Sequence, residues 1–195
     1  MKSLEKVFVS IVAIALILGC SGTASATEFR KNLKETKWED GRLRIEGQGW
    51  AGIRSGRRSR TDDYGVTATV EKEFALGHRL SAGLRAMPLF FMSESDSRGR
   101  DGNNILGAGL GFSVRYYVKE VHDGFFFESY ETAIWQSDTF RGNSGRVNFL
   151  TEVGVGYEFD NDWHVALKWR HMSNAGIASR NAGVNGLGIG IGFSF

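Results

Sequence analysis

Two side chains that can carry out ester chemistry, His171 and Ser173, lie two positions apart in the stretch KWRHMSNAGI. An imidazole beside a serine hydroxyl makes the serine a nucleophile, because the base removes the hydroxyl proton as the oxygen attacks a carbonyl carbon. The backbone N–H groups of Asn174 and Gly176, or the Asn174 side-chain amide, can stabilise the oxyanion that forms. These residue types therefore predict a site for attack on an ester.

The pair ends a segment of period two, in which Val165, Leu167 and Trp169 alternate with polar and small residues. Continuing the alternation places His171 and Ser173 on the apolar face, about 7 Å apart at the backbone. An imidazole reaches a serine oxygen over that distance if the strand end is twisted or bent. Polar side chains that face lipid are costly, so they indicate function, and a lipid ester is the substrate they could reach. Alternatively, both are ordinary interfacial residues, since His-x-Ser is common by chance.

The same alternation recurs in eight segments after residue 40, at about 43–53, 64–76, 80–90, 106–118, 124–136, 147–159, 164–173 and 187–195. One face is apolar, with aromatic residues near the segment ends, and Phe90 belongs to this face in the third segment. Segments of about ten residues match strands that cross a bilayer, and in lipid the sheet must close. We therefore predict an all-β fold, an eight-stranded antiparallel transmembrane β-barrel, over a soluble β-sandwich. Its interior would hold glycines and the charges Glu71, Glu73, Arg85, Arg115, Glu152, Lys168 and Arg170.

The N-terminus has the features of a secretory signal peptide, residues 1–26. Lys2 and Lys6 precede an apolar core, and ASA at 24–26 is a small-residue cleavage site. ILGC also allows lipidation of Cys20, the single cysteine, in place of cleavage after residue 26. Residues 27–41 would form a periplasmic lead-in and 42–195 the barrel. The formal net charge of +2 gives no nucleic-acid signature, and a chain cleaved after residue 26 has no cysteine for a disulfide or metal site.

Connection lengths predict the orientation of the barrel. Those after the second, fourth and sixth segments are short (LGHR, KEVHDG, DNDW), and those after the first, third and fifth are longer. Short turns belong on the periplasmic side, so both termini are expected there, and the His-x-Ser pair lies in the outer leaflet. Phe195 ends an alternating apolar strand, like the signal read by the barrel-assembly machinery. A homodimer is also compatible with the sequence.

Charged loops offer secondary binding candidates. Four arginines in the first long loop suit phosphates or acidic sugars, although a solvated loop explains them equally well; they are Arg54, Arg57, Arg58 and Arg60. The second long loop carries Glu94, Asp96 and Asp101 without the spacing of a calcium loop, which favours a flexible loop and no metal.

The C-terminal region resembles a known family. HMSNAGI, RNAGVN and the glycine-rich last strand are similar to the lipid A 3-O-deacylase (PagL-type) family of outer-membrane esterases, whose His-x-Ser-Asn-Ala-Gly motif matches from His171 to Gly176. The resemblance implies that His171 is the base, Ser173 the nucleophile, and Asn174 and Gly176 the oxyanion contributors. The implied reaction is hydrolysis of the 3-O-linked 3-hydroxyacyl chain of lipid A in lipopolysaccharide, without a metal or organic cofactor.

One position departs from the family pattern. The family has a glutamate twelve residues after the serine, where this chain has Asn185. If Ser173 and Gly183 close the last hairpin, Asn185 lies across from His171 and can accept its N–H, but it supplies no charge. Either the Ser-His-Asn set works, or another acid assists, or activity has been lost. Asp138 and Glu128 are not evidently within reach.

Three functions remain open from the sequence: a lipid A deacylase, a non-catalytic structural or adhesion barrel, and an acyltransferase or phospholipase acting on outer-leaflet lipid. Polar residues on the lipid face separate the first from the second, since a passive barrel has no use for them. Only the reaction products separate the first from the third.

Overall fold

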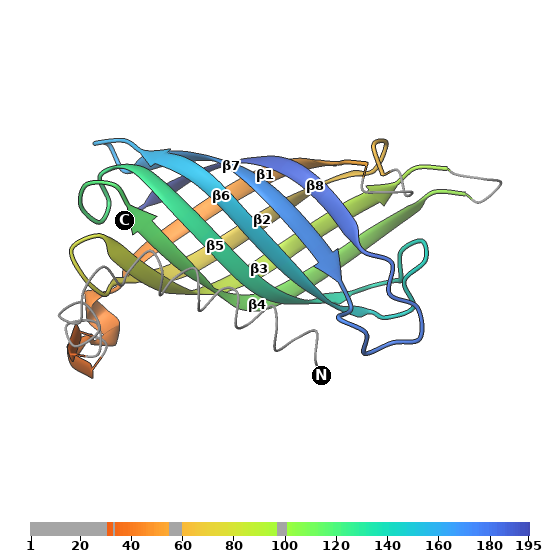
Figure 1. The fold of residues 1–195 in the computed structure, drawn as a ribbon, viewed down its shortest axis with the longest axis horizontal. Coiled ribbons are helices and arrows are strands. Elements are labelled where there is room, and N and C mark those ends of the chain that lie inside the picture. Colours follow the sequence, from red (N-terminus) through yellow and green to blue (C-terminus); the bar gives the residue numbers. More distant parts are fainter. Residues whose placement is uncertain (1–30, 33, 55–59, 97–100) are drawn as a thin grey trace.

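The alternating segments fold into eight antiparallel strands that close into one barrel, as the sequence predicts (Figure 1). The computed structural model describes residues 31–32, 34–54, 60–96 and 101–195. The strands are β1 (Arg42–Gly52), β2 (Tyr64–Ala75), β3 (Leu80–Glu94), β4 (Asn103–Tyr117), β5 (Gly124–Gln136), β6 (Val147–Glu158), β7 (Trp163–Ser173) and β8 (Val184–Ser194). Each strand pairs with the next and β1 pairs with β8, so the sheet satisfies its own backbone groups.

A short 3₁₀-helix, η1 (Trp38–Asp40), precedes the barrel. The Trp38 ring packs against Phe74 on the outside of β2, with ring centroids 5.7 Å apart. In the part of the chain that the structure describes, no helix is long and apolar enough to cross a membrane. The predicted signal peptide, including Cys20, lies outside the described residues.

Large apolar side chains point outward from all eight strands. They form the exposed surface expected where a barrel meets lipid; examples are Ile45, Val66, Leu84, Leu110, Phe127, Val155, Leu167 and Ile189. Exposed aromatic residues lie near both ends of the barrel, among them Trp135 at one end and Trp163 and Phe195 at the other.

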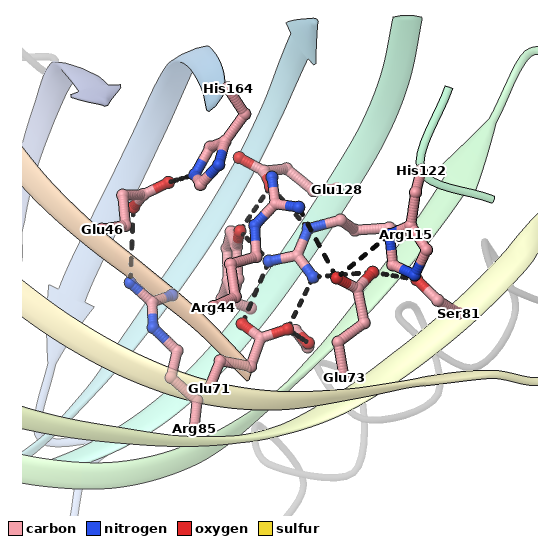
Figure 2. A network of polar contacts seen from close by, with 12 residues as sticks. Arg44, Glu46, Glu71, Glu73, Ser81, Arg85, Arg115, His122, Glu128 and His164 are labelled. Carbon is pink, nitrogen blue, oxygen red and sulfur yellow. Dashed lines mark hydrogen bonds and ion pairs between the residues drawn. The ribbon is translucent and has the colours of Figure 1, made fainter. Parts of the chain in front are cut away.

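The inward positions hold a network of opposite charges. All seven interior charges expected from the alternation are buried, together with Arg44, Glu46, Glu128 and Glu158. Figure 2 shows Arg115 among carboxylates, with its Nη1 2.5 Å from Glu71 Oε1 and its Nε 3.1 Å from Glu128 Oε2. These charges are paired and hydrogen-bonded, which is the condition for burying them without a large loss of stability.

An apolar cluster fills the barrel interior toward one end. It comprises Trp50, Met87, Phe90, Met92, Ile105, Ile134, Phe140, Leu150, Met172 and Val184. The expected outward position of Phe90 is wrong, because its side chain is 1% exposed and belongs to this cluster. The β3 register shifts between Met87 and Phe90, where Pro88 cannot donate a ladder hydrogen bond. The extra residue reverses the in–out parity of the strand from that point.

The longer connections, after β1, β3, β5 and β7, emerge at one end of the barrel, on the right in Figure 1. This end is called the long-loop end below. The short turns after β2, β4 and β6 lie at the opposite end, together with the C-terminus. The last residues of β7 and the first of β8, which carry the His-x-Ser motif and Asn185, are therefore at the long-loop end.

Candidate active site

His171 and Asn185 face each other across the β7–β8 ladder on the outside of the barrel. They are register partners, and both are partly exposed between buried neighbours. His171 Nδ1 donates to Asn185 Oδ1 over 2.7 Å, because an amide oxygen can only accept. This bond places the proton on Nδ1 and leaves Nε2 as the basic nitrogen. The expected cross-strand pairing is therefore confirmed in the structure.

The rest of the imidazole lies over Gly183, the residue before β8. A Cβ at this position would lie 2.6 Å from His171 Cε1 and 3.3 Å from Nε2, so the ring occupies the space that a side chain would fill. On its own strand, the His171 ring stacks on Trp169, with centroids 6.2 Å apart and planes 12° apart. Trp169 and Asn185 together set the tilt of the ring, and the missing side chain of residue 183 makes room for it.

Ser173 ends β7 on the same outward face as His171. Extending the ladder by one residue past the Met172↔Val184 pair puts Ser173 opposite Gly183, over which the Cε1–Nε2 edge of the imidazole lies. Among the described residues, the Ser173 hydroxyl makes no hydrogen bond, so it is not held away from the base. Contacts between a catalytic nucleophile and its base are often open in free enzymes and tighten when substrate binds.

The turn after Ser173 is held by the Asn174 side chain, which is fully buried. Its Nδ2 donates to Asn143 Oδ1 over 3.0 Å and to the Arg180 carbonyl over 2.8 Å, and its Oδ1 accepts the Gly176 N–H. Its backbone N–H donates to Asn181 Oδ1. The donors of Asn174 and Gly176 that the sequence assigns to an oxyanion are thus engaged, either within the turn or with Asn143.

A comparison with protein families identifies the family of this chain. Residues 62–194 match the family model described as lipid A 3-O-deacylase (PagL). The chain belongs to the PagL family. The match covers β2 to β8 and therefore includes the whole His171–Asn185 hairpin. A comparison with curated proteins gave no match.

Several solved structures are similar to this PagL-family chain, among them an outer membrane enzyme and a designed transmembrane β-barrel. The outer membrane enzyme PagL aligns with a TM-score of 0.50 and 18% identity, covering 77% of this chain and 98% of that one. A designed transmembrane β-barrel aligns with a TM-score of 0.44 and 14% identity, covering 83% of this chain and 99% of the designed one. The N-terminal barrel domain of Pseudomonas aeruginosa OprF aligns with a TM-score of 0.41 and 14% identity, covering 78% of this chain and 99% of the OprF chain. Family and fold together place the PagL-family chain in the outer membrane.

The sequence did not reveal the amide network beneath the motif of this PagL-family chain. Asn143, in the connection after β5, is 2% exposed, and its Nδ2 donates to Asn148 Oδ1 over 2.9 Å. Asn148 in turn donates to Gln136 Oε1 over 2.6 Å. The network thus ties the turn after β7 to the neighbouring β5–β6 hairpin. No local pattern predicts it, because Asn143 and Asn174 are far apart in the sequence.

The arginines of the first long loop differ from one another in their surroundings. Arg60 is 5% exposed and contacts Asp63 Oδ2 at 3.0 Å and Glu94 Oε1 at 2.5 Å, so it ties the connection after β1 to the end of β3. Arg54 is exposed, and Arg57 and Arg58 lie outside the described residues. Within the described ranges, no group of three or more His, Cys, Asp or Glu side chains could hold a metal ion.

Proposed function

We propose that this chain is an outer-membrane esterase that hydrolyses the 3-O-linked 3-hydroxyacyl chain of lipid A, with Ser173 as nucleophile and His171 as base. The observation that carries the proposal is the outward direction of both side chains at the long-loop end, with His171 Nδ1 fixed by Asn185. If that end lies in the outer leaflet, as the loop lengths indicate, an ester of a surface glycolipid can reach both groups.

The proposed reaction uses the two groups in turn. Ser173 Oγ attacks the ester carbonyl carbon while His171 Nε2 takes the hydroxyl proton. The sugar 3-oxygen then leaves and receives that proton, which leaves the acyl group on Ser173. Water attacks the acyl-serine, gives its proton to Nε2 and releases the 3-hydroxy fatty acid, and the proton on Nε2 returns to Ser173. Asn185 keeps Nδ1 protonated throughout and so fixes the tautomer.

The motif still predicts that Asn174 and Gly176 stabilise the oxyanion. Because their N–H groups donate within the turn, each must exchange a hydrogen bond to serve. The Ala175 N–H lies between them and makes no hydrogen bond among the described residues. Ala175 has a φ of 52°, in the left-handed region, which suits a turn that must present a backbone donor next to Ser173.

The test is to express the full chain in a Gram-negative host with unmodified lipid A and to determine the lipid A mass by mass spectrometry. The expected result is loss of one 3-hydroxyacyl chain, abolished by Ser173→Ala and by His171→Ala. Matched controls are Ser129→Ala, an outward serine on β5, and His78→Ala, in the turn after β2; neither is expected to change the product. An unchanged lipid A mass with a folded barrel contradicts the proposal, and acyl loss from phospholipids instead indicates a phospholipase.

A further inference from the structure

Four polar residues form one row across the outside of the barrel, on strands that lie side by side (Figure 1). Glu131 on β5 pairs in register with Thr151 on β6, Thr151 pairs with His171 on β7, and His171 pairs with Asn185 on β8. All four side chains are partly exposed, between buried neighbours in their strands. The row thus extends the His171–Asn185 pair by two residues toward β5.

Glu131 is the unusual member of this row. In the burial pattern of β5 it falls on the outward face with Phe127 and Trp135, whereas Glu128 points inward. Of the outward-facing positions in the eight described strands, only this one holds a carboxylate. A carboxylate that faces lipid is costly, and structural carboxylates in this barrel are placed inside, next to arginine or lysine.

The Glu131 carboxylate is held toward the active site. Both of its oxygens accept a hydrogen bond from Thr151 Oγ1, at 2.9 and 3.0 Å. Thr151 is the direct cross-strand neighbour of His171, so this contact directs the carboxylate to the side of the row where the imidazole lies. On the other side, the register partner of Glu131 is Phe112 on β4, an apolar residue.

We propose that Glu131 is a positioning residue for the esterase reaction, held by Thr151 so that its negative charge stabilises the imidazolium of His171. The inference rests on the proposed function and deepens it, because it names the acid that Asn185 does not supply. No proton passes to Glu131. It acts through space while His171 Nε2 holds the proton taken from Ser173.

Distance and surroundings make this charge effective. Strands are about 4.8 Å apart, so residues two strands apart are separated by roughly 10 Å at the backbone. Charges interact over that distance where lipid and protein, instead of water, lie between them. The ionisable side chains on the outward faces of β5 to β8 are Glu131, Tyr157 and His171. No lysine or arginine on these faces neutralises Glu131.

The experiment compares Glu131→Gln, Glu131→Asp and Thr151→Val in the full-length protein, purified in detergent and supplied with purified lipid A. We expect Glu131→Gln to lower kcat on the order of tenfold with KM unchanged, because the charge acts when the imidazolium forms. The acidic limb of the pH–rate profile should move to lower pH, since loss of the carboxylate makes the imidazole easier to deprotonate. Glu131→Asp should retain more activity than Glu131→Gln, and Ser129→Ala is the matched control on the same face of β5.

A second arm separates a charge effect from a purely structural one. With Asn185→Glu, which places a carboxylate directly on His171, the further change Glu131→Gln should have little effect on kcat. Equal losses in both backgrounds, a change in KM alone, or an unshifted pH profile would overturn the inference. If Glu131→Gln does not fold, Thr151→Val replaces it as the test, because it removes the hydroxyl that holds the carboxylate. Its kcat, KM and pH–rate profile are then compared with those of the wild type.

The proposed function can fail separately from this inference. An inactive wild-type protein removes both. An active wild type that is abolished by Ser173→Ala and unaffected by Glu131→Gln leaves the esterase proposal intact and removes the role of Glu131.

Discussion

His171 Nδ1 donates a 2.7 Å hydrogen bond to Asn185 Oδ1 across the β7–β8 ladder. An asparagine here orients the ring and selects the tautomer as a carboxylate would, but it adds no charge to stabilise the imidazolium. Orientation and charge are therefore separate properties at this site, and they can be altered one at a time.

Asn185→Glu is expected to raise kcat, because it adds charge and keeps an acceptor on Nδ1. In a serine protease triad, replacing the acid by its amide lowers kcat by roughly 10⁴, so the reverse change is expected to give at least about a tenfold gain. Asn185→Ala is expected to lower kcat by about ten- to a hundredfold, because the ring loses its orienting bond. Both are measured as release of 3-hydroxy fatty acid from lipid A. Full activity of Asn185→Ala would remove Asn185 from the mechanism.

Gly183→Ala is expected to impair catalysis while the barrel still forms. Its Cβ would lie 2.6 Å from His171 Cε1, so the ring must leave its position over residue 183. A displacement of about 1 Å at a reacting group can cost on the order of a hundredfold in rate. Gly47→Ala is the matched control, since a Cβ there meets nothing within 4 Å. The readouts are kcat and heat-dependent gel mobility of the barrel; an active Gly183→Ala enzyme would show that the ring does not need this position.

Much of the fold was predictable because lipid on one side and a narrow interior on the other impose a strict period of two. The predicted limits of β5, residues 124–136, agree with the structure. The alternation also placed His171 and Ser173 outward, as the burial pattern of β7 shows. The assumption that Ser173 and Gly183 close the last hairpin placed Asn185 opposite His171, as the β7–β8 register shows. Phe90 was misplaced because a bulge adds one residue, and period-two reasoning cannot detect that addition.

The surroundings of the site were less predictable, because they depend on contacts between distant segments. Asn143 meets Asn174 only after β5, β6 and β7 have paired in register. Glu131 comes next to the site in the same way, since its strand is separated from β7 by all of β6. The sequence did not identify an assisting acid, and neither Glu128 nor Asp138 was evidently within reach. Glu128 points into the barrel, and Asp138 lies in the connection after β5, where it accepts from Asn103.

Asn143→Ala is expected to loosen the turn that follows Ser173. It removes the acceptor of Asn174 Nδ2 and the donor to Asn148 Oδ1, and each buried polar group left unpaired costs about 1–3 kcal/mol. We expect a lower thermal midpoint, faster proteolysis within residues 174–183 and reduced kcat. Asn104→Ala, at an exposed position on β4, is the control. A variant as stable and active as the wild type would show that the amide network does not position the site.

Arg54 and Arg60 are expected to respond differently to replacement by alanine, although they flank the same loop. Arg60→Ala leaves Asp63 and Glu94 buried without their main cation, and breaking such a pair costs about 3–5 kcal/mol, so the thermal midpoint should fall. Arg54 is exposed, so Arg54→Ala should leave stability unchanged. If Arg54 meets a lipid A phosphate, its loss raises KM severalfold with kcat unchanged, because uniform binding is lost. Titration of both variants against lipid A with and without its phosphates measures this, and an Arg54→Ala enzyme with wild-type KM would assign that arginine to solvent alone.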